Sequence, residues 1–233
     1  MLKFITCIFL IAISVMCFAN TKSKVLICVA MPEECEGIIE EFNYNKISDN
    51  IFENEKSILI ITGIGKVNAA LWTQYGIDHY NISYIFNYGF VGDNTKKLKL
   101  NDIILPEKVM QHDFNMQQEG YVLGQVQGQD KYIFKNNTDL YYKLKLHIPI
   151  KKVEYLLTGD RFVPEDLRGI ENSVSDMEGY AIARVAYNAK KPVLFIKFNS
   201  NDCSFEGVKE YEKDFDNCKK ELFKNVKQII AAL

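Results

Sequence analysis

Hydrophobic positions along the chain form continuous apolar runs that alternate with segments of helical periodicity. The runs are rich in β-branched and aromatic residues and are typical of strands buried on both faces; they cover residues 25–30, 57–62, 83–88, 102–105, 153–158 and 193–198. Helical spacing is found in residues 32–42, 66–80, 140–146, 179–188 and 205–233. In the helix expected at 66–80, Val67, Ala70 and Leu71 are predicted to face the sheet. The alternation predicts an α/β fold with helices on both faces of one sheet.

Residues 106–132 interrupt this alternation. The segment is polar, rich in glutamine, and broken by Gly120, Gly124 and Gly128. We expect an irregular hairpin there, and this is where we expect a partner subunit to make contact.

The first residues have the three parts of a secretory signal. Lys3 gives a basic start, an apolar core runs from Phe4 to Met16, and Ala19 is a small residue before a cleavage point. The core is shorter than the ~20 residues that span a bilayer. We therefore predict a signal peptide over residues 1–20, a single domain over 21–233, and an exported protein, periplasmic or secreted, without stable membrane insertion. An uncleaved anchor or a misassigned start codon are the alternatives.

Composition narrows the classes of partner and cofactor. The formal net charge is −2 with 48% hydrophobic residues, which suits one globular domain and does not point to nucleic acid. The cysteines outside the predicted signal show no paired CxxC spacing, which argues against zinc; they are Cys28, Cys35, Cys203 and Cys218. An exported chain could form a disulfide, but the sequence assigns no pairing.

Short polar or glycine-containing segments follow several of the expected strands. Sheets of this class bind ligands at the carboxyl ends of their strands, so these segments are expected to meet. Each also has a simpler explanation. Glu178 could merely favour helix initiation, Gly63 and Gly65 could only permit a tight turn, Phe162 could belong to the core, and Glu34 could lie on a solvated helix face.

Taken together and in order, these segments resemble the nucleoside phosphorylase superfamily, most closely its bacterial methylthioadenosine/S-adenosylhomocysteine nucleosidases. The matching segments are Ala30–Glu34, Gly63–Val67, Thr158–Val163, Ser175–Ala181 and Asn199–Asp202. The resemblance extends from about Val25 to Leu233. It implies a three-layer αβα sandwich on a mixed, partly barrel-like sheet, and a homodimer. It also implies hydrolysis of the N-glycosidic bond of adenine thionucleosides without a metal or organic cofactor.

The resemblance also implies roles for individual residues. Glu34 would position and activate the attacking water, because a carboxylate can accept a proton as the nucleophile forms. Glu178 would accept hydrogen bonds from the 2′ and 3′ hydroxyls of the ribose. The remaining contacts divide between sugar and base: Met177 would pack on the sugar, Ile64 would line the sugar or alkylthio side, Phe162 would stack on the purine, and the Val163 backbone would bond its edge.

Asn201 departs from the nucleosidase pattern. The family has an aspartate there that protonates the purine, whereas an amide donates a hydrogen bond but delivers no proton. General acid help is typically worth ~100 to 10,000-fold in rate. Asp202 could replace the acid only if the loop were shifted, because neighbouring residues on a strand point to opposite faces.

Other departures bear on the reaction and the substrate. Phe90 occupies the place of a phosphate-binding serine, and the charge of Glu34 would repel phosphate, so hydrolysis is favoured over phosphorolysis. Lys197 stands where an arginine is usual and lacks its planar fork. Glu119 stands where an aromatic residue is expected in the alkylthio pocket, which indicates a more polar 5′ substituent or an empty pocket.

Three functions remain open on this basis. The first is a purine nucleosidase acting on methylthioadenosine, S-adenosylhomocysteine or a related nucleoside. The second is a nucleoside-binding or surface protein of the same fold with impaired catalysis. The third is a phosphorylase for 6-oxopurines, since some purine nucleoside phosphorylases use asparagine at the position of Asn201.

Overall fold

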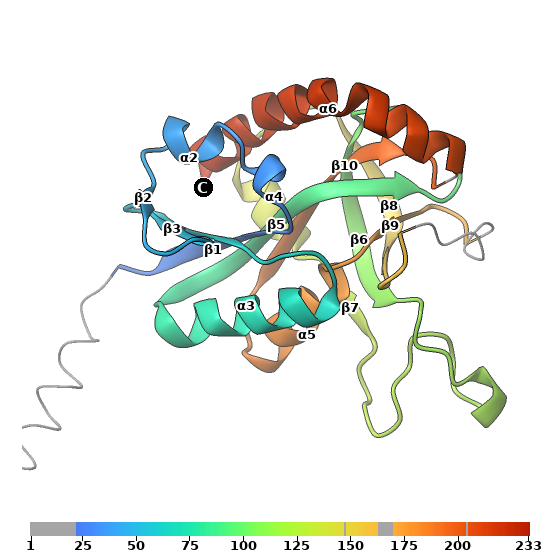
Figure 1. Ribbon diagram of the computed structural model, residues 1–233. Helices are drawn as coiled ribbons and strands as arrows, with labels where there is room; N and C mark the ends of the chain where they lie inside the picture. The colour runs from blue at the N-terminus through green and yellow to red at the C-terminus, as the bar shows by residue number, and fades with distance from the viewer. Residues whose placement is uncertain (1–21, 147, 163–169, 204) are drawn as a thin grey trace, which may run out of the picture.

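The computed structural model describes residues 22–146, 148–162, 170–203 and 205–233 (Figure 1). Within these ranges, ten strands form one mixed sheet in the order β10-β6-β8-β9-β5-β1-β4-β3-β2, with β7 paired to β6. The strands are β1 (Lys24–Val29), β2 (Asn45–Lys46), β3 (Ile51–Glu53), β4 (Ser57–Ile61), β5 (Ile82–Asp93), β6 (Ile103–Gln111), β7 (Ile133–Lys135), β8 (Ile150–Thr158), β9 (Ser173–Asp176) and β10 (Val193–Asn201). The α-helices are α2 (Ile38–Glu41), α3 (Lys66–His79), α4 (Thr138–Lys143), α5 (Gly179–Asn188) and α6 (Phe205–Ala232), and the 3-10 helices are η1 (Pro32–Glu34) and η2 (Gln117–Glu119).

Half of the sheet closes into a barrel. Strand β5 pairs with β9 on one side and, along its length, in parallel with β10. Because β10 also pairs with β6, the strands β10, β6, β8, β9 and β5 form a closed ring. The sheet then continues outward from β5 through β1 and β4 to the antiparallel edge strands. The predicted mixed, partly barrel-like sheet is confirmed.

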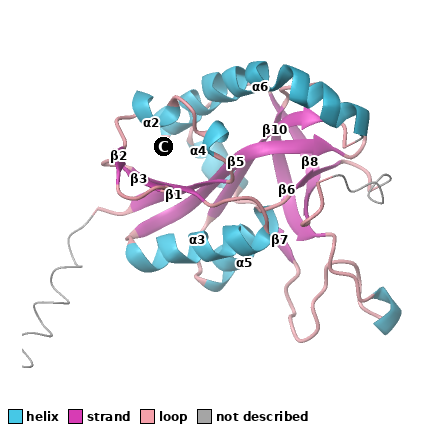
Figure 2. Cartoon of the chain, viewed as in Figure 1, coloured by secondary structure: helices cyan, strands magenta, loops and turns pink. Residues whose placement is uncertain are grey.

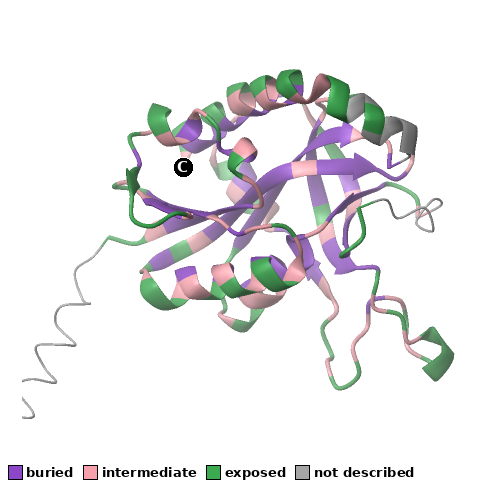
Figure 3. Ribbon diagram, in the orientation of Figure 1, coloured by how far each residue is buried: buried purple, intermediate pink, exposed green. Residues whose placement is uncertain are grey.

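Helices cover both faces of the sheet, as Figures 1 and 2 show. Helices α3 and α5 lie on one face, and α2, α4 and α6 lie on the other. The two faces of the sheet each have a hydrophobic core, and alternate residues of β1 point into one or the other. Leu26 packs in the core under α3 and α5, and Ile27 packs in the core under α6. Both are fully buried, and burying such a side chain contributes about 1.5–3 kcal/mol. The strands between the helices are accordingly buried, while the outer helix faces are exposed (Figure 3).

Helix α3 packs with the opposite face to the one predicted. Val67 and Leu71 are 79% and 59% exposed, whereas Ala69, Thr73 and Gly76 are buried. The reason is close approach, because a methyl group at Gly76 would lie 2.8 Å from the side chain of Leu26. Small residues therefore face the sheet and two branched apolar residues face outward; Ala70 is partly buried against the core.

Four expected strands are longer than predicted, and four short strands were not predicted. Strand β8 begins earlier, at Ile150, and β10 ends later, at Asn201. Strand β5 continues through Gly89 to Asp93, and β6 continues through Pro106 to Gln111. Pro106 is tolerated because β10 pairs only as far as Ile104 on that side, and the Asn136 side chain donates to the Pro106 carbonyl at 2.7 Å. Strands β2, β3, β7 and β9 are only two to four residues long, too short for a periodic signal.

The helix predicted over residues 32–42 is divided into η1 and α2. Gly37 lies between them with φ 79°, in the left-handed region that favours glycine. A methyl group on Gly37 would lie 3.0 Å from the ring of Phe223 on α6. Packing against the terminal helix therefore interrupts the periodic segment.

Several predictions concern the thiols, the membrane and metals. The four cysteines of the described chain are free and buried, and burial raises the pKa of Cys28 and Cys35 to about 12. Within the described ranges, no helix has the length and apolar content needed to cross a bilayer. The same residues contain no group of three or more His, Cys, Asp or Glu side chains arranged to hold a metal ion.

Candidate active site

A cavity of about 660 Å³, counting its space open to solvent, lies where β1, β9 and β10 end. It is lined by Ala30, Met31, Glu34, Ile64, Phe90, Val91, Gly92, Arg161, Phe162, Ser175, Asp176, Met177, Glu178, Ser200, Asn201 and Cys203. Six predicted site residues are therefore brought together: Glu34, Ile64, Phe162, Met177, Glu178 and Asn201. Val163, the seventh, lies outside the described residues.

The side chain of Glu34 points into the protein and is held there by backbone amides. Its Oε2 accepts hydrogen bonds from the amides of Ala30 at 2.7 Å and Met31 at 3.1 Å, and its Oε1 accepts from the Phe90 amide at 3.0 Å. A methyl group on Gly89 would lie 2.5 Å from Oε1, so the glycine makes room for the carboxylate in the middle of β5. Glu34 is only 4% exposed and does not lie on a solvated helix face.

The surroundings of Glu34 make its carboxylate more basic than one in water. Burial raises the pKa of this carboxyl, while the Phe90 amide and the charge of Lys197 partly oppose the rise. A carboxylate with a raised pKa is a stronger proton acceptor than one in water, and general bases are tuned in this direction.

Glu178 precedes α5 and contacts a turn from a distant part of the chain. Its Oε1 accepts a hydrogen bond from the Gly65 amide at 2.8 Å, and its Oε2 accepts from the Met177 amide at 3.3 Å. Burial and the neighbouring Asp176 raise its pKa to about 8, against the opposing charge of Lys197. The carboxyl group thus has spare acceptor positions that face the cavity.

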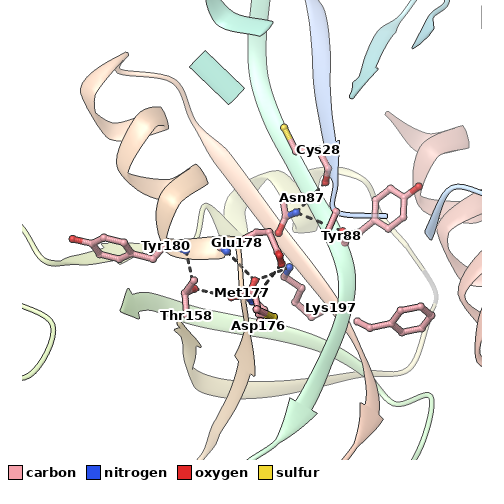
Figure 4. A network of polar contacts seen from close by, with 12 residues as sticks. Cys28, Asn87, Tyr88, Thr158, Asp176, Met177, Glu178, Tyr180 and Lys197 are labelled. Carbon is pink, nitrogen blue, oxygen red and sulfur yellow. Dashed lines mark hydrogen bonds and ion pairs between the residues drawn. The ribbon is translucent and has the colours of Figure 1, made fainter. Parts of the chain in front are cut away.

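Asp176 is the carboxylate that accepts a hydrogen bond from the first amide of α5. Its Oδ2 accepts from the Gly179 amide at 2.9 Å at the start of α5, and its Oδ1 accepts from the Thr158 hydroxyl at 2.6 Å (Figure 4). The same Oδ2 lies 2.9 Å from Lys197 Nζ, and both side chains are almost completely buried. The helix-initiation role that the sequence allows for Glu178 thus belongs to Asp176, and Glu178 is left to face the cavity.

The side-chain amide oxygen of Asn201 already accepts a hydrogen bond from the backbone. Oδ1 accepts a hydrogen bond from the Cys203 amide at 2.9 Å, and Nδ2 donates to Ser200 Oγ at 3.0 Å. Because a backbone N–H requires an acceptor, this contact fixes which end of the amide is oxygen. Nδ2 retains a second N–H. Asp202 pairs instead with Lys96 at 3.3 Å, and it is not among the residues that line the cavity.

The outer wall is apolar and open to solvent. Phe162 is 60% exposed and Ile64 is 51% exposed, so Phe162 is not a core residue. Phe90 is half-buried and lies deeper, with its ring centroid 6.2 Å from that of Phe215. Sequence reasoning gave no role to Arg161, Ser175 or Ser200, although each lies within one of the matched segments.

A family model described as Phosphorylase superfamily matches residues 24–233. The chain belongs to the phosphorylase superfamily. The resemblance inferred from the short motifs is therefore confirmed, and it covers the described structure from the first strand to the last helix.

Relatives of this superfamily member include nucleosidases. The 5′-methylthioadenosine/S-adenosylhomocysteine nucleosidase of Buchnera aphidicola subsp. Acyrthosiphon pisum is 32% identical over 212 residues, covering 84% of this chain and 89% of the relative. The enzyme of the same name from Shewanella loihica is 29% identical over 172 residues, covering 69% of this chain and 74% of the relative.

Solved structures of superfamily members have the same fold. A Borrelia burgdorferi structure, assigned to the same nucleosidase activity and bound to adenine, has a TM-score of 0.77 and 30% identity, and covers 90% of this chain and 100% of its own. A Helicobacter pylori nucleosidase, in an aspartate-to-asparagine variant with 5′-methylthioadenosine in the active site, has a TM-score of 0.81. It is 23% identical and covers 91% of this chain and 100% of its own. These likenesses confirm the fold.

Proposed function

We propose that the protein hydrolyses the N-glycosidic bond of nucleosides of the methylthioadenosine and S-adenosylhomocysteine type. The observation that carries this proposal is the cavity that holds a buried Glu34 and a buried Glu178 together with the exposed ring of Phe162. The Buchnera aphidicola relative, named for this activity, matches most of the chain, and the Borrelia burgdorferi structure holds adenine.

Each of the predicted cavity residues has its own part in the proposed reaction. The purine would stack on Phe162, Met177 would pack on the sugar, and Glu178 would accept hydrogen bonds from the ribose hydroxyls. Glu34 would take a proton from water as its oxygen attacks C1′. The bond between C1′ and the purine nitrogen breaks, and its electron pair leaves with the base.

Asn201 sets how the leaving base is stabilised. The second N–H of Nδ2 would donate a hydrogen bond to the departing purine, which then takes its proton from solvent rather than from the protein. Since a general acid is typically worth ~100 to 10,000-fold, we expect slow turnover and ordinary binding.

The test measures free base released from methylthioadenosine by residues 21–233, with and without phosphate, beside an Asn201→Asp variant. Release by the parent without phosphate, and faster release by the variant, would support the proposal. Release only with phosphate would overturn it in favour of a phosphorylase, against which the position of Phe90 and the charge of Glu34 argue.

A second candidate is a nucleoside-binding protein that has lost turnover. It is favoured by one observation, the Asn201 oxygen held by the Cys203 amide, which leaves an amide rather than an acid at that position. In that case calorimetry would detect binding of methylthioadenosine to the parent, with base release only from Asn201→Asp.

We also propose a homodimer. Ile64, Val67 and Leu71 are spaced along one side of α3 and its preceding turn and are all exposed. Ile64 also lines the cavity, so a second copy packed there would cover both the apolar strip and the cavity mouth. The molar mass of the protein by light scattering, beside a Val67→Asp/Leu71→Asp variant, tests this. A monomeric parent would overturn it.

Finally, we propose that residues 1–20 are a cleaved export signal. The support is the basic, apolar and small-residue order of that segment. Expression of the whole chain followed by N-terminal sequencing of the exported product tests it; recovery of intact Met1 in the cytoplasm alone would overturn it.

A further inference from the structure

Three charged residues outside the cavity join the two loops that form its outer wall. Lys66 follows the turn that carries Ile64, and Asp160 precedes Phe162. Asp113 lies just beyond the end of β6, in a third segment of the chain. None of the three is among the cavity-lining residues, so their part in the site is indirect.

The contacts among the three form a closed set. The Lys66 amide donates to Asp160 Oδ1 at 2.9 Å, and Lys66 Nζ donates to Asp113 Oδ1 at 2.5 Å. The Asp160 amide donates to Asp113 Oδ2 at 2.8 Å. Asp113 thus uses one oxygen for each loop, and its side chain is only 17% exposed. Burial acts to raise the pKa of Asp113, but the hydrogen bonds from Lys66 and the Asp160 amide outweigh it and the pKa falls.

The set is continuous with the sugar-facing carboxylate. Gly65, between Ile64 and Lys66, donates its amide to Glu178. The residue has φ 94°, and a methyl group on it would lie 3.2 Å from Asp160 Oδ1, so the turn lies closely against the second loop. A shift of the turn would therefore move Ile64 and the Gly65 amide together.

We propose that Lys66, Asp113 and Asp160 form a latch that fixes the turn 63–66 against residues 159–162, and that Lys66 and Asp113 are positioning residues for nucleoside binding. Charge-assisted hydrogen bonds at low exposure are suited to this because they set geometry as well as adding energy. The consequence for nucleoside affinity rests on the proposed function, whereas the latch itself does not.

The first experiment measures amide hydrogen exchange of the unliganded protein by NMR, for the parent and an Asp113→Ala variant. The informative amide is Gly65, because its own acceptor, Glu178, is untouched by the substitution. We expect its exchange to become about tenfold faster as the turn loosens. The matched control is Lys108→Met, which removes an ion pair of 2.9 Å to Glu154; neither of these two residues lines the cavity. Unchanged Gly65 exchange in Asp113→Ala would overturn the latch.

The second experiment separates KM from kcat for methylthioadenosine. Asp113→Ala and Lys66→Met are expected to raise KM about tenfold with kcat changed less than about twofold, because Glu34 is not in contact with the latch. Lys66→Arg, which keeps the cation, should restore most of the affinity. Equal losses in all variants including Lys108→Met would indicate general destabilisation and overturn the positioning role. If the parent neither binds nor cleaves the nucleoside, the proposed function fails, and the exchange result still decides the latch.

Discussion

Glu178 accepts a hydrogen bond at 2.8 Å from the backbone amide of Gly65, which lies 113 positions earlier in the chain. The contact joins the start of α5 to the turn before α3, the two helices that pack together on one face of the sheet. It orients one carboxylate oxygen and leaves the group free to accept from a ligand. The geometry of the proposed sugar site therefore depends on how a glycine turn is held.

Gly65→Ala should weaken nucleoside binding as well as stability. Gly65 has φ 94°, and holding a non-glycine residue in such a region costs about 1–3 kcal/mol. Relief of that strain would turn the amide away from Glu178. Gly120→Ala is the matched control, because Gly120 has φ 85° and open space around it. Gly65→Ala should lose at least as much stability in urea as Gly120→Ala, because only its methyl group meets a neighbour, and only Gly65→Ala should lose affinity for methylthioadenosine. Equal affinities would contradict this account.

The raised pKa of Glu178 predicts a pH dependence of stability. The folded value is about 8 and the ordinary value is 4.5, so between these pH values the folded protein holds a proton that the unfolded chain has released. The free energy of unfolding should therefore fall as pH rises from about 4.5 to about 8, by at most about 1.4 kcal/mol per pH unit. Urea unfolding at several pH values, for the parent and Glu178→Gln, measures it. Glu34 contributes in the same direction, so the difference between the two curves isolates Glu178, and parallel curves would contradict the assignment.

Loss of Lys197 should be more costly than loss of an exposed lysine. Lys197→Met would leave Asp176 buried without its cation, which typically costs about 3–5 kcal/mol. Lys108→Met removes a pair of the same length, 2.9 Å, whose side chains are 36% and 42% exposed, and should cost about 0–1 kcal/mol. Urea unfolding compares them. Adding Asp176→Asn to Lys197→Met should recover part of the loss; no recovery would show that the orphaned charge is not the cause.

Glu34→Gln should abolish most turnover while leaving the fold intact. An amide cannot accept the proton of the attacking water, and the expected loss is at least about 100-fold. The side-chain NH₂ of the new glutamine would also face a backbone N–H that the Glu34 carboxylate accepts from in the parent. This should cost about 1–3 kcal/mol in stability. Glu33→Gln on the same 3-10 helix changes the charge equally without touching the cavity lining. If base release by Glu34→Gln equals that by Glu33→Gln, Glu34 does not activate water.

Six of the residues that line the cavity were predictable because each lies at or just after the end of a strand, in a segment that matches a family motif. The carboxyl ends of neighbouring strands meet by topology, so order along the chain was enough to group Glu34, Glu178 and Asn201. The division of labour between Asp176 and Glu178 was not predictable. Both lie in one short motif, and only the distances to Gly179 and Gly65 tell which carboxylate begins α5 and which holds the glycine turn before α3.

The α/β class, the superfamily and six of the residues around the cavity follow from the amino-acid sequence, because these depend on local periodicity and on the order of short motifs. Which side of α3 is buried depends on the fold. The two branched residues could equally face the sheet, but the helix approaches Leu26 so closely that only Gly76 fits there. The lengths of β5 and β6 also depend on the fold, because pairing with distant strands overrides the local signals of Gly89 and Pro106. The contacts among Lys66, Asp113 and Asp160 also depend on the fold, because they join segments that only the three-dimensional arrangement brings together.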